Sequence, residues 1–201
     1  MNNIQSLDRL TQIIARLPGI GSRTAFRLAL YLFDCDDEYL KEFSDILLSL
    51  HKDIKLCSEC YSLSDNDICY ICSNDKRDHN KICVAESYSD MLAIENTEEY
   101  NGVYHILGGL IAPIKGIGIS DIRIKELIER VKKNNIEEIM IAFSASLEAD
   151  TTASYIYKTL RDNNFNGKVT HITYGISLAS DIENADTRSL ARSILDRVEM
   201  N

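Results

Sequence analysis

Four cysteines constrain this chain of 201 residues more than any other feature of its sequence. They follow the pattern C-x2-C-x8-C-x2-C and comprise Cys57, Cys60, Cys69 and Cys72. Two C-x2-C turns bring their thiolates together and supply the sulfurs of a tetrahedral Zn2+ site. Because every ligand comes from the protein, no coordination position is left for a catalytic water. The sequence therefore predicts one structural zinc ion per chain.

A pair of disulfides is the alternative interpretation of these cysteines. The N-terminal stretch MNNIQSLDRL shows no basic region followed by an apolar one, as a secretion signal would. No apolar run reaches the length of about 18 residues that a membrane span needs. We therefore expect a cytoplasmic chain without a membrane segment, in which thiols stay reduced and bind metal. Cys35 and Cys83 each lie in an apolar run and are expected in the core.

The composition is that of an ordinary globular protein of one or two domains, with 45% hydrophobic residues and only 2 prolines. A net charge of −9 argues against a surface that coats DNA as a whole. The charge is unevenly placed, however. Residues 9–33 contain four arginines and no acidic residue. Taken alone, this pattern is typical of a solvated helix face, but the sequence between the arginines indicates more.

An amphipathic helix is expected at the start of this basic segment. Residues 4–16 place apolar side chains at helical spacing, and Pro18 then ends the helix. Gly19 and Gly21 permit positive φ values and let an external group approach the backbone closely. Ser22 is expected to cap a second helix that begins there. The sequence therefore predicts two helices joined by a glycine-rich turn.

The predicted hairpin resembles a helix-hairpin-helix motif, in which the glycine turn offers backbone N–H groups to a nucleic-acid phosphate. The positive end of the second helix dipole favours such an anion. Arg23 and Arg27 lie one helical turn apart beside Gly19 and Gly21, where they can contact adjacent phosphates. Such contacts give affinity without base specificity. A helical hairpin that binds no ligand is the alternative, and we favour DNA binding.

A third amphipathic helix is expected over residues 38–55, immediately before the cysteines. The apolar side chains expected on its inward face are Leu40, Phe43, Leu47 and Leu50. His51 lies close to the zinc ligands in sequence. Because four thiolates already complete the site, we expect His51 to be exposed and not to bind metal.

From residue 80 onward, short apolar strands alternate with helices. Strands are expected over 82–85, 103–106, 139–142 and 168–173. Helices are expected over 88–95, 121–134 and 149–162. This alternation predicts an α/β domain with a parallel, helix-covered sheet. The glycine-rich stretch 107–119 matches no phosphate-binding motif and is expected to be a flexible loop, with a partner-contact surface as a further interpretation.

Acidic residues follow two of the expected strands, at the edge where parallel sheets bind ligands. Glu86 follows the first strand, and Glu148 and Asp150 follow a later one. This arrangement resembles a Toprim domain, whose enzymes hold Mg2+ with such a glutamate and an Asp-x-Asp pair. Here Ser144 and Ser146 stand at the two aspartate positions. Because Mg2+ requires charged carboxylate ligands, we expect no catalysis.

The order of these elements resembles, along essentially the whole chain, the RecR family of bacterial recombination mediators. The resemblance rests on the cysteine pattern and on LPGIGSRTAFRLAL, ICVAESYSDMLAIE and YHILGGLIAPIKGIG. It departs from the family where Ala149 replaces a glycine and where residues 175–183 lack a Gly-Gly pair. It implies four segments: a helix-hairpin-helix DNA-binding region (1–55), a four-cysteine zinc finger (56–79), a Toprim domain (80–174) and a C-terminal helical segment (175–201).

The resemblance implies a DNA-repair mediator without enzymatic activity. Such proteins bind single-stranded, double-stranded and gapped DNA as homodimers or ring-like homotetramers. With RecO, and in many bacteria RecF, they help to load RecA onto DNA coated by single-strand-binding protein. The resemblance implies that DNA is contacted by Gly19, Gly21, Arg23 and Arg27. It implies that the zinc ligands are Cys57, Cys60, Cys69 and Cys72. It also implies a partner-binding acidic patch of Glu86, Glu148 and Asp150. A Mg2+-dependent Toprim nuclease, primase or topoisomerase is the alternative.

Overall fold

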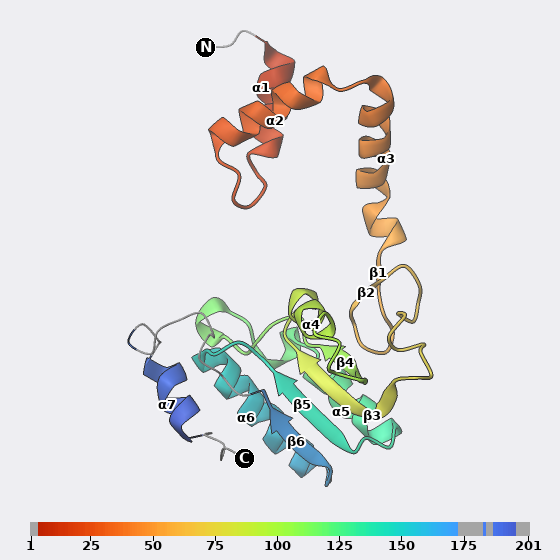
Figure 1. Cartoon of the computed structure of the whole chain (residues 1–201), viewed down its shortest axis with the longest axis vertical. Coiled ribbons are helices and arrows are strands. Elements are labelled where there is room, and N and C mark those ends of the chain that lie inside the picture. Colours follow the sequence, from red (N-terminus) through yellow and green to blue (C-terminus); the bar gives the residue numbers. More distant parts are fainter. Residues whose placement is uncertain (1–3, 173–182, 184–186, 196–201) are drawn as a thin grey trace. The chain divides into compact units, whose positions relative to one another are not determined.

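The computed structural model describes residues 4–172, 183 and 187–195 (Figure 1). The predicted C-terminal segment, with the altered run 175–183, therefore lies mostly outside the described residues, apart from helix α7 (Thr187–Leu195) and residue 183. The chain divides into two compact units, Met1–Asp53 and Ile54–Asn201, which are described separately below. Among the described residues, no helix is both long enough and apolar enough to cross a membrane.

The first unit is helical. Its helices are α1 (Gln5–Ile14), α2 (Ser22–Asp34) and α3 (Asp37–Asp53). The first two pack against each other around a small buried core of Ile14, Ala25 and Ala29. The predicted pair of helices joined by a glycine turn is thus present, with apolar side chains of α1 and α2 meeting on one side.

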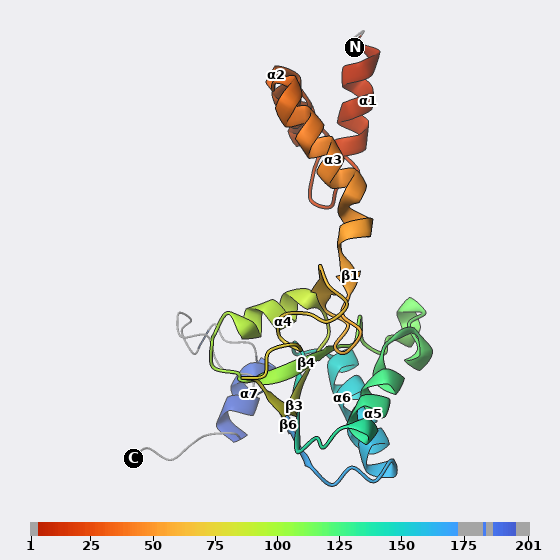
Figure 2. The same cartoon turned by 90° about the vertical axis from the view of Figure 1, so that its right-hand side faces the viewer.

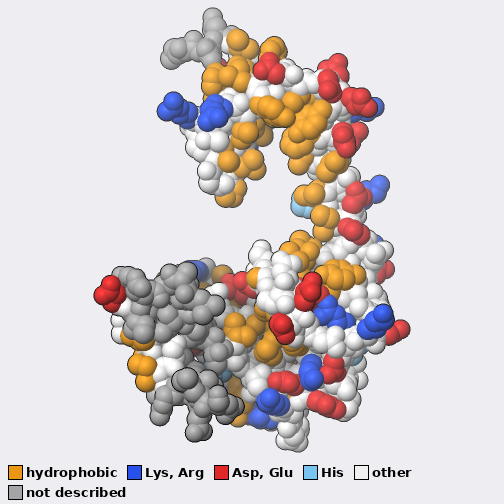
Figure 3. Space-filling view, viewed as in Figure 1, with side chains coloured by type: hydrophobic (Ala, Val, Ile, Leu, Met, Phe, Trp, Pro, Cys, Tyr) orange, Lys and Arg blue, Asp and Glu red, His pale blue; other side chains and the backbone are white. Residues whose placement is uncertain are grey.

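The face of α3 that was expected to point inward is not buried. The helix has no buried residue, and Phe43, Leu47 and Leu50 are 43%, 54% and 43% exposed. Apolar side chains are spread over the surface of this unit (Figure 3). A groove of about 480 Å3, lined by residues such as Phe33 and Phe43, is almost wholly apolar. The expectation of an inward face was wrong because the single chain leaves this face in solvent.

The second unit is built on a parallel sheet of four strands in the order β4-β3-β5-β6. The strands are β3 (Asp78–Ala85), β4 (Gly102–Ile106), β5 (Glu138–Ala142) and β6 (Lys168–His171). The helices between them are α4 (Tyr88–Glu95), α5 (Ile124–Lys133) and α6 (Leu147–Asp162). Helices α5 and α6 cover one face of the sheet and α4 the other (Figure 2). The α/β prediction is confirmed.

Burial of both faces of the sheet explains why the strand sequences are continuous apolar runs. Strand β4 is buried at all five positions, and β3 is buried over its last four residues. In register, Ile82 lies beside Val103 on one side and Ile139 on the other. Strands covered on both faces need apolar side chains at every position. Cys83 lies in this core, as predicted, whereas Cys35 is only half-buried.

The cysteine loop belongs to the second unit and has no core of its own. Its short hairpin pairs β1 (Lys55–Leu56) with β2 (Leu63–Ser64). Cys57, Cys60, Cys69 and Ile71 lie in the same buried cluster as the sheet residues. The N–H of Ile106 on the edge strand β4 donates to the Cys60 carbonyl at 2.8 Å. The loop thus covers part of a sheet edge that would otherwise expose backbone groups.

The glycine-rich stretch after β4, expected to be flexible, contains defined turns. It holds two short 3-10 helices, η1 (Pro113–Lys115) and η2 (Ile119–Asp121). Gly116 follows η1 with a φ of +76°, a value that glycine adopts without strain. Ala112 and Ile117 form a β-bridge, and the Ile111 N–H donates to Thr152 Oγ1 of α6 at 2.9 Å. These contacts fix the loop beside the carboxyl ends of the strands.

Candidate functional site

The four cysteine sulfurs converge. All of them lie within 4.8 Å of one another, and the Cys60 and Cys69 sulfurs are 3.6 Å apart. Tetrahedral zinc with Zn–S bonds of about 2.3 Å places its sulfurs about 3.8 Å apart, so the cluster fits Zn2+. Three of the ligands are buried and Cys72 is half-buried. Within the described parts of the chain, no second group of three or more potential metal ligands gathers in this way.

Contacts between the sulfurs shift the pKa values of the thiols in opposite directions. The hydrogen bond between Cys60 and Cys69 lowers the pKa of Cys69 and raises the pKa of Cys60 to about 12. Hydrogen bonds with the same two sulfurs raise the pKa of Cys72. The cluster therefore favours one thiolate and holds protons on its neighbours, which a zinc ion replaces when it binds thiolates.

The glycine turn of the hairpin is open on its outer side. Gly19 has a φ of +78°, and a side chain added at Gly19 or Gly21 would meet no atom within 4 Å. Gly21 is the N-cap of α2, and no side chain caps this helix. The cap predicted at Ser22 was wrong because Ser22 is already the first helical residue. The N–H groups of the first turn of α2 are therefore free to bind an external acceptor.

Four exposed arginines lie on or next to the two helices that this turn joins. Arg9 and Arg16 lie on and just after α1, and Arg23 and Arg27 occupy the first two turns of α2. Across residues 4–172, none of the four forms an ion pair with an acidic side chain. Their charges are therefore uncompensated near the positive end of α2, which favours an anionic ligand.

Two of the three predicted acidic residues lie near each other beyond the carboxyl ends of β3 and β5. Burial, Asp90 and Glu148 raise the pKa of Glu86. Lys115, from the loop after β4, opposes this shift, and its Nζ lies 3.6 Å from Glu148 Oε1. A backbone hydrogen bond and Lys115 lower the pKa of Glu148. The ammonium of Lys115 thus partly balances this pair of carboxylates.

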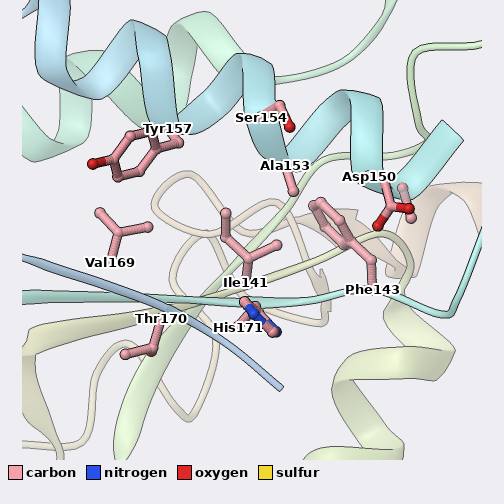
Figure 4. A pocket seen from close by; sticks show the side chains of 10 residues that line it. Ile141, Phe143, Asp150, Ala153, Ser154, Tyr157, Val169, Thr170 and His171 are labelled. Atoms are coloured by element: carbon pink, nitrogen blue, oxygen red, sulfur yellow. The ribbon is translucent and has the colours of Figure 1, made fainter. Parts of the chain in front are cut away.

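The third acidic residue, Asp150, lines a different feature, a cleft of about 570 Å3 between α6 and β6. Figure 4 shows Tyr157 of α6 pointing toward Val169 of β6 across this cleft, with Asp150 farther along the helix beside Phe143. The structure therefore places Glu86 and Glu148 in one neighbourhood and Asp150 beside another.

The two serines predicted to occupy the Toprim aspartate positions, Ser144 and Ser146, differ in their surroundings. Ser144 is exposed after β5. Ser146 is the N-cap of α6, and its hydroxyl accepts a hydrogen bond from the Ala149 N–H at 3.0 Å. This hydroxyl serves to begin a helix, a common use of serine.

Comparisons with known proteins agree with this architecture. Three family profiles match: the RecR helix-hairpin-helix over residues 7–51, the RecR four-cysteine zinc finger domain over 54–74, and the Toprim domain over 80–172. A recombination protein RecR from Brachyspira hyodysenteriae is 87% identical over 201 residues, the full length of both chains. The chain belongs to the RecR family. RecR proteins from Parabacteroides distasonis and Flavobacterium johnsoniae are 42% and 43% identical, over 97% and 96% of this chain and 93% and 92% of theirs.

Membership of the RecR family and the sulfur geometry together establish the zinc site. The matched zinc-finger segment contains all four converging cysteines. Zinc bound there would complete its coordination with protein sulfurs alone and stabilise the loop, since four protein ligands leave no open position for chemistry. His51 is exposed, as predicted.

Sequence reasoning missed two basic residues that the RecR fold brings to these sites. Lys115 reaches Glu148 from a loop that carries no motif for this contact. Arg130 Nη2 on α5 lies 3.8 Å from Cys72 Sγ, although the two residues are 58 positions apart. Neither contact has a periodic signal in the sequence, because only the folded chain brings these side chains together.

Replacing one zinc ligand should unfold the cysteine loop. We expect Cys57→Ser to lose bound zinc and to lower the free energy of unfolding by several kcal/mol, because structural zinc binds with about 10–16 kcal/mol. Zinc content by atomic emission and thermal unfolding by calorimetry check this. Cys35→Ser, outside the cluster, is the control; full zinc content with unchanged stability in Cys57→Ser would refute the assignment.

Proposed function

We propose that this RecR-family protein acts in DNA repair and recombination as a mediator that binds DNA without sequence preference and does not cut or rejoin it. The observation that carries the proposal is the open glycine turn beside unpaired arginines. Gly19 and Gly21 leave the backbone accessible, while Arg23 and Arg27 stand next to the free N–H groups of α2. A phosphate is the group that this combination of donors and positive charge favours.

Contacts of this kind do not distinguish bases. Backbone amides and arginines that meet phosphates read only the position of the sugar-phosphate chain, so single-stranded, double-stranded and gapped DNA all offer suitable ligands. One hairpin presents few contacts, and affinity from phosphates falls steeply with salt. Several hairpins acting on the same DNA molecule would raise the affinity well above that of a single chain.

The surroundings of the Toprim acidic residues support a role without catalysis. Ser144 and Ser146 provide neutral hydroxyls where Toprim enzymes have metal-binding aspartates, and one hydroxyl already caps α6. Lys115 places a positive charge against Glu148, where a cation would otherwise be attracted. Two-metal phosphoryl transfer depends on bridging carboxylates, which this set of side chains supplies poorly.

Family membership supports a proposal about protein partners. We propose that the protein acts with RecO, and with RecF as a second candidate, to help load RecA onto DNA coated by single-strand-binding protein in the cytoplasm. Glu86, Glu148 and Asp150 are the proposed partner-binding residues. Exposed Leu147 adjoins Glu148 in the sequence, and exposed Ile114 adjoins Lys115, which pairs with Glu148. Acidic groups mixed with apolar ones suit a basic, partly apolar partner surface.

We also propose that the protein assembles into homodimers or ring-like homotetramers. The unburied apolar face of α3 and the adjoining apolar groove support this, since large exposed apolar patches on soluble proteins mark interfaces. Assembly also helps to explain how a chain of net charge −9 binds DNA, because several copies of residues 9–33 would concentrate arginines on one surface.

Reversing the charge of the hairpin should remove DNA binding. We expect Arg23→Glu with Arg27→Glu to weaken binding of a fluorescent oligonucleotide beyond detection by anisotropy, because contacts with phosphates supply the affinity. Each lost phosphate contact should also reduce the slope of log affinity against log salt concentration by about 0.7–0.9. The matched control is Lys125→Glu with Lys158→Glu, which changes the net charge equally at exposed positions of the α/β unit. Wild-type affinity in the folded hairpin variant would overturn the assignment.

Neutralising the acidic patch should weaken binding to RecO. We expect Glu86→Gln, Glu148→Gln and Asp150→Asn together to lower the affinity, measured by titration calorimetry, by about tenfold or more. DNA binding should be unchanged. Neutralising the exposed Glu98, Glu99 and Asp162 of the same unit is the control. Equal affinities for RecO in both variants would show that the partner binds elsewhere.

Charges on the apolar face of α3 should dissociate the assembly. We expect Leu47→Glu with Leu50→Glu to yield monomers by sedimentation equilibrium, because burying two charges in an apolar interface is strongly unfavourable. Lys52→Glu changes the net charge by the same amount at an exposed position on the opposite, polar side of the helix and serves as the control. An unchanged oligomeric state in the leucine variant would place the interface on another surface.

A further inference from the structure

Three sulfurs of the zinc site have hydrogen-bonding groups from within the cysteine loop. The Cys57 sulfur accepts from the Cys69 N–H at 3.3 Å, and the Cys69 sulfur accepts from the Cys72 N–H at 3.5 Å. The Cys60 sulfur lies 3.1 Å from the hydroxyl of the buried Ser62. Such donors orient thiolates and stabilise their charge when they bind a metal. The cysteine loop itself therefore supplies a hydrogen-bonding group to each of these three ligands.

The hydrogen-bond donor to the Cys72 sulfur comes from outside the loop and is Arg130 of α5. Arg130 Nη2 lies 3.8 Å from Cys72 Sγ, while Nη1 donates to the Tyr104 carbonyl of β4 at 2.6 Å. Arg130 Nε lies 3.7 Å from the carboxylate of Glu59, between the first two cysteines. One guanidinium thereby contacts both C-x2-C turns and the edge strand on which the loop rests.

The charge and burial of Arg130 suit this position. Its side chain is only 10% exposed, so water screens its charge weakly. Four thiolates around one Zn2+ ion leave a net negative charge, which a nearby guanidinium offsets. The planar guanidinium also presents several N–H donors in a fixed arrangement, whereas a lysine offers a single point charge.

We propose that Arg130 is a positioning residue of the zinc site: by holding Cys72 and offsetting the charge of the thiolates, it slows the release of zinc. Zinc retention by the cysteine loop therefore depends on a side chain of the Toprim domain. The proposal concerns the zinc site alone and is independent of the DNA and partner contacts.

The rate of zinc release tests this proposal. The full-length, zinc-loaded protein is mixed with excess 4-(2-pyridylazo)resorcinol, and the absorbance of the zinc–dye complex is followed with time. We expect Arg130→Met to release zinc faster than wild type by about 10–100-fold, the usual effect of removing a group that supports a metal ligand. In the Co2+-substituted protein, the thiolate charge-transfer bands of this variant should shift.

The control variant Arg161→Met distinguishes a positioning role of Arg130 at the zinc site from a general loss of stability. Arg161 lies in the last turn of α6 and donates to the Phe165 carbonyl at 2.6 Å, without contact to a cysteine. This variant should lower the melting temperature but keep the wild-type release rate and cobalt spectrum. A wild-type release rate and spectrum in Arg130→Met, with stability lowered as in Arg161→Met, would overturn the proposal.

A second variant covers the case in which Arg130→Met does not fold. Arg130→Lys keeps the positive charge but cannot reach the Cys72 sulfur and the Tyr104 carbonyl with the same fork of donors. We expect this variant to fold and to release zinc measurably faster than wild type. A wild-type release rate in folded Arg130→Lys would contradict a positioning role for the guanidinium.

Discussion

The convergence of four thiolates is the interaction on which the second unit depends. The cysteine loop is too poor in apolar residues to fold alone, and a metal that binds it supplies the missing free energy of folding. Its buried cysteines lie in the same core as the sheet, and the Cys60 carbonyl accepts a hydrogen bond from the edge strand β4. The zinc element is therefore part of the packing of the α/β unit, not an appendage to it.

Several features could be predicted from the sequence because their signals are local. The cysteine spacing fixes the ligand set, and the buried runs around Ile82 and Ile139 indicate parallel strands. Features that depend on the folded chain could not be predicted. The contact between Arg130 and Cys72 joins distant segments, and Ser22 is a helix residue because the extended conformation falls on Gly21. The helical spacing of apolar residues in α3 predicts a buried face, although the single chain leaves this face exposed.

The proposed functions of the protein, DNA binding and partner binding, are divided between the two units. The helical unit carries exposed arginines and an open turn suited to phosphates, whereas the second unit carries acidic groups and a zinc-stabilised sheet. Ser146, which we assign to a metal-binding position of Toprim enzymes, caps helix α6 through its hydroxyl. A fold that supports phosphoryl transfer in other proteins thus becomes, in our account, a scaffold for partners.

The central claim is that the protein binds DNA and leaves it chemically intact. The most direct measurement is an agarose gel of supercoiled plasmid incubated with purified protein and Mg2+, run before and after removal of the protein. Our account predicts a retarded plasmid that returns to its supercoiled position once the protein is removed. Nicked or relaxed plasmid after deproteinisation, abolished by Glu86→Ala, would show that the remaining carboxylates still perform chemistry and would contradict the account.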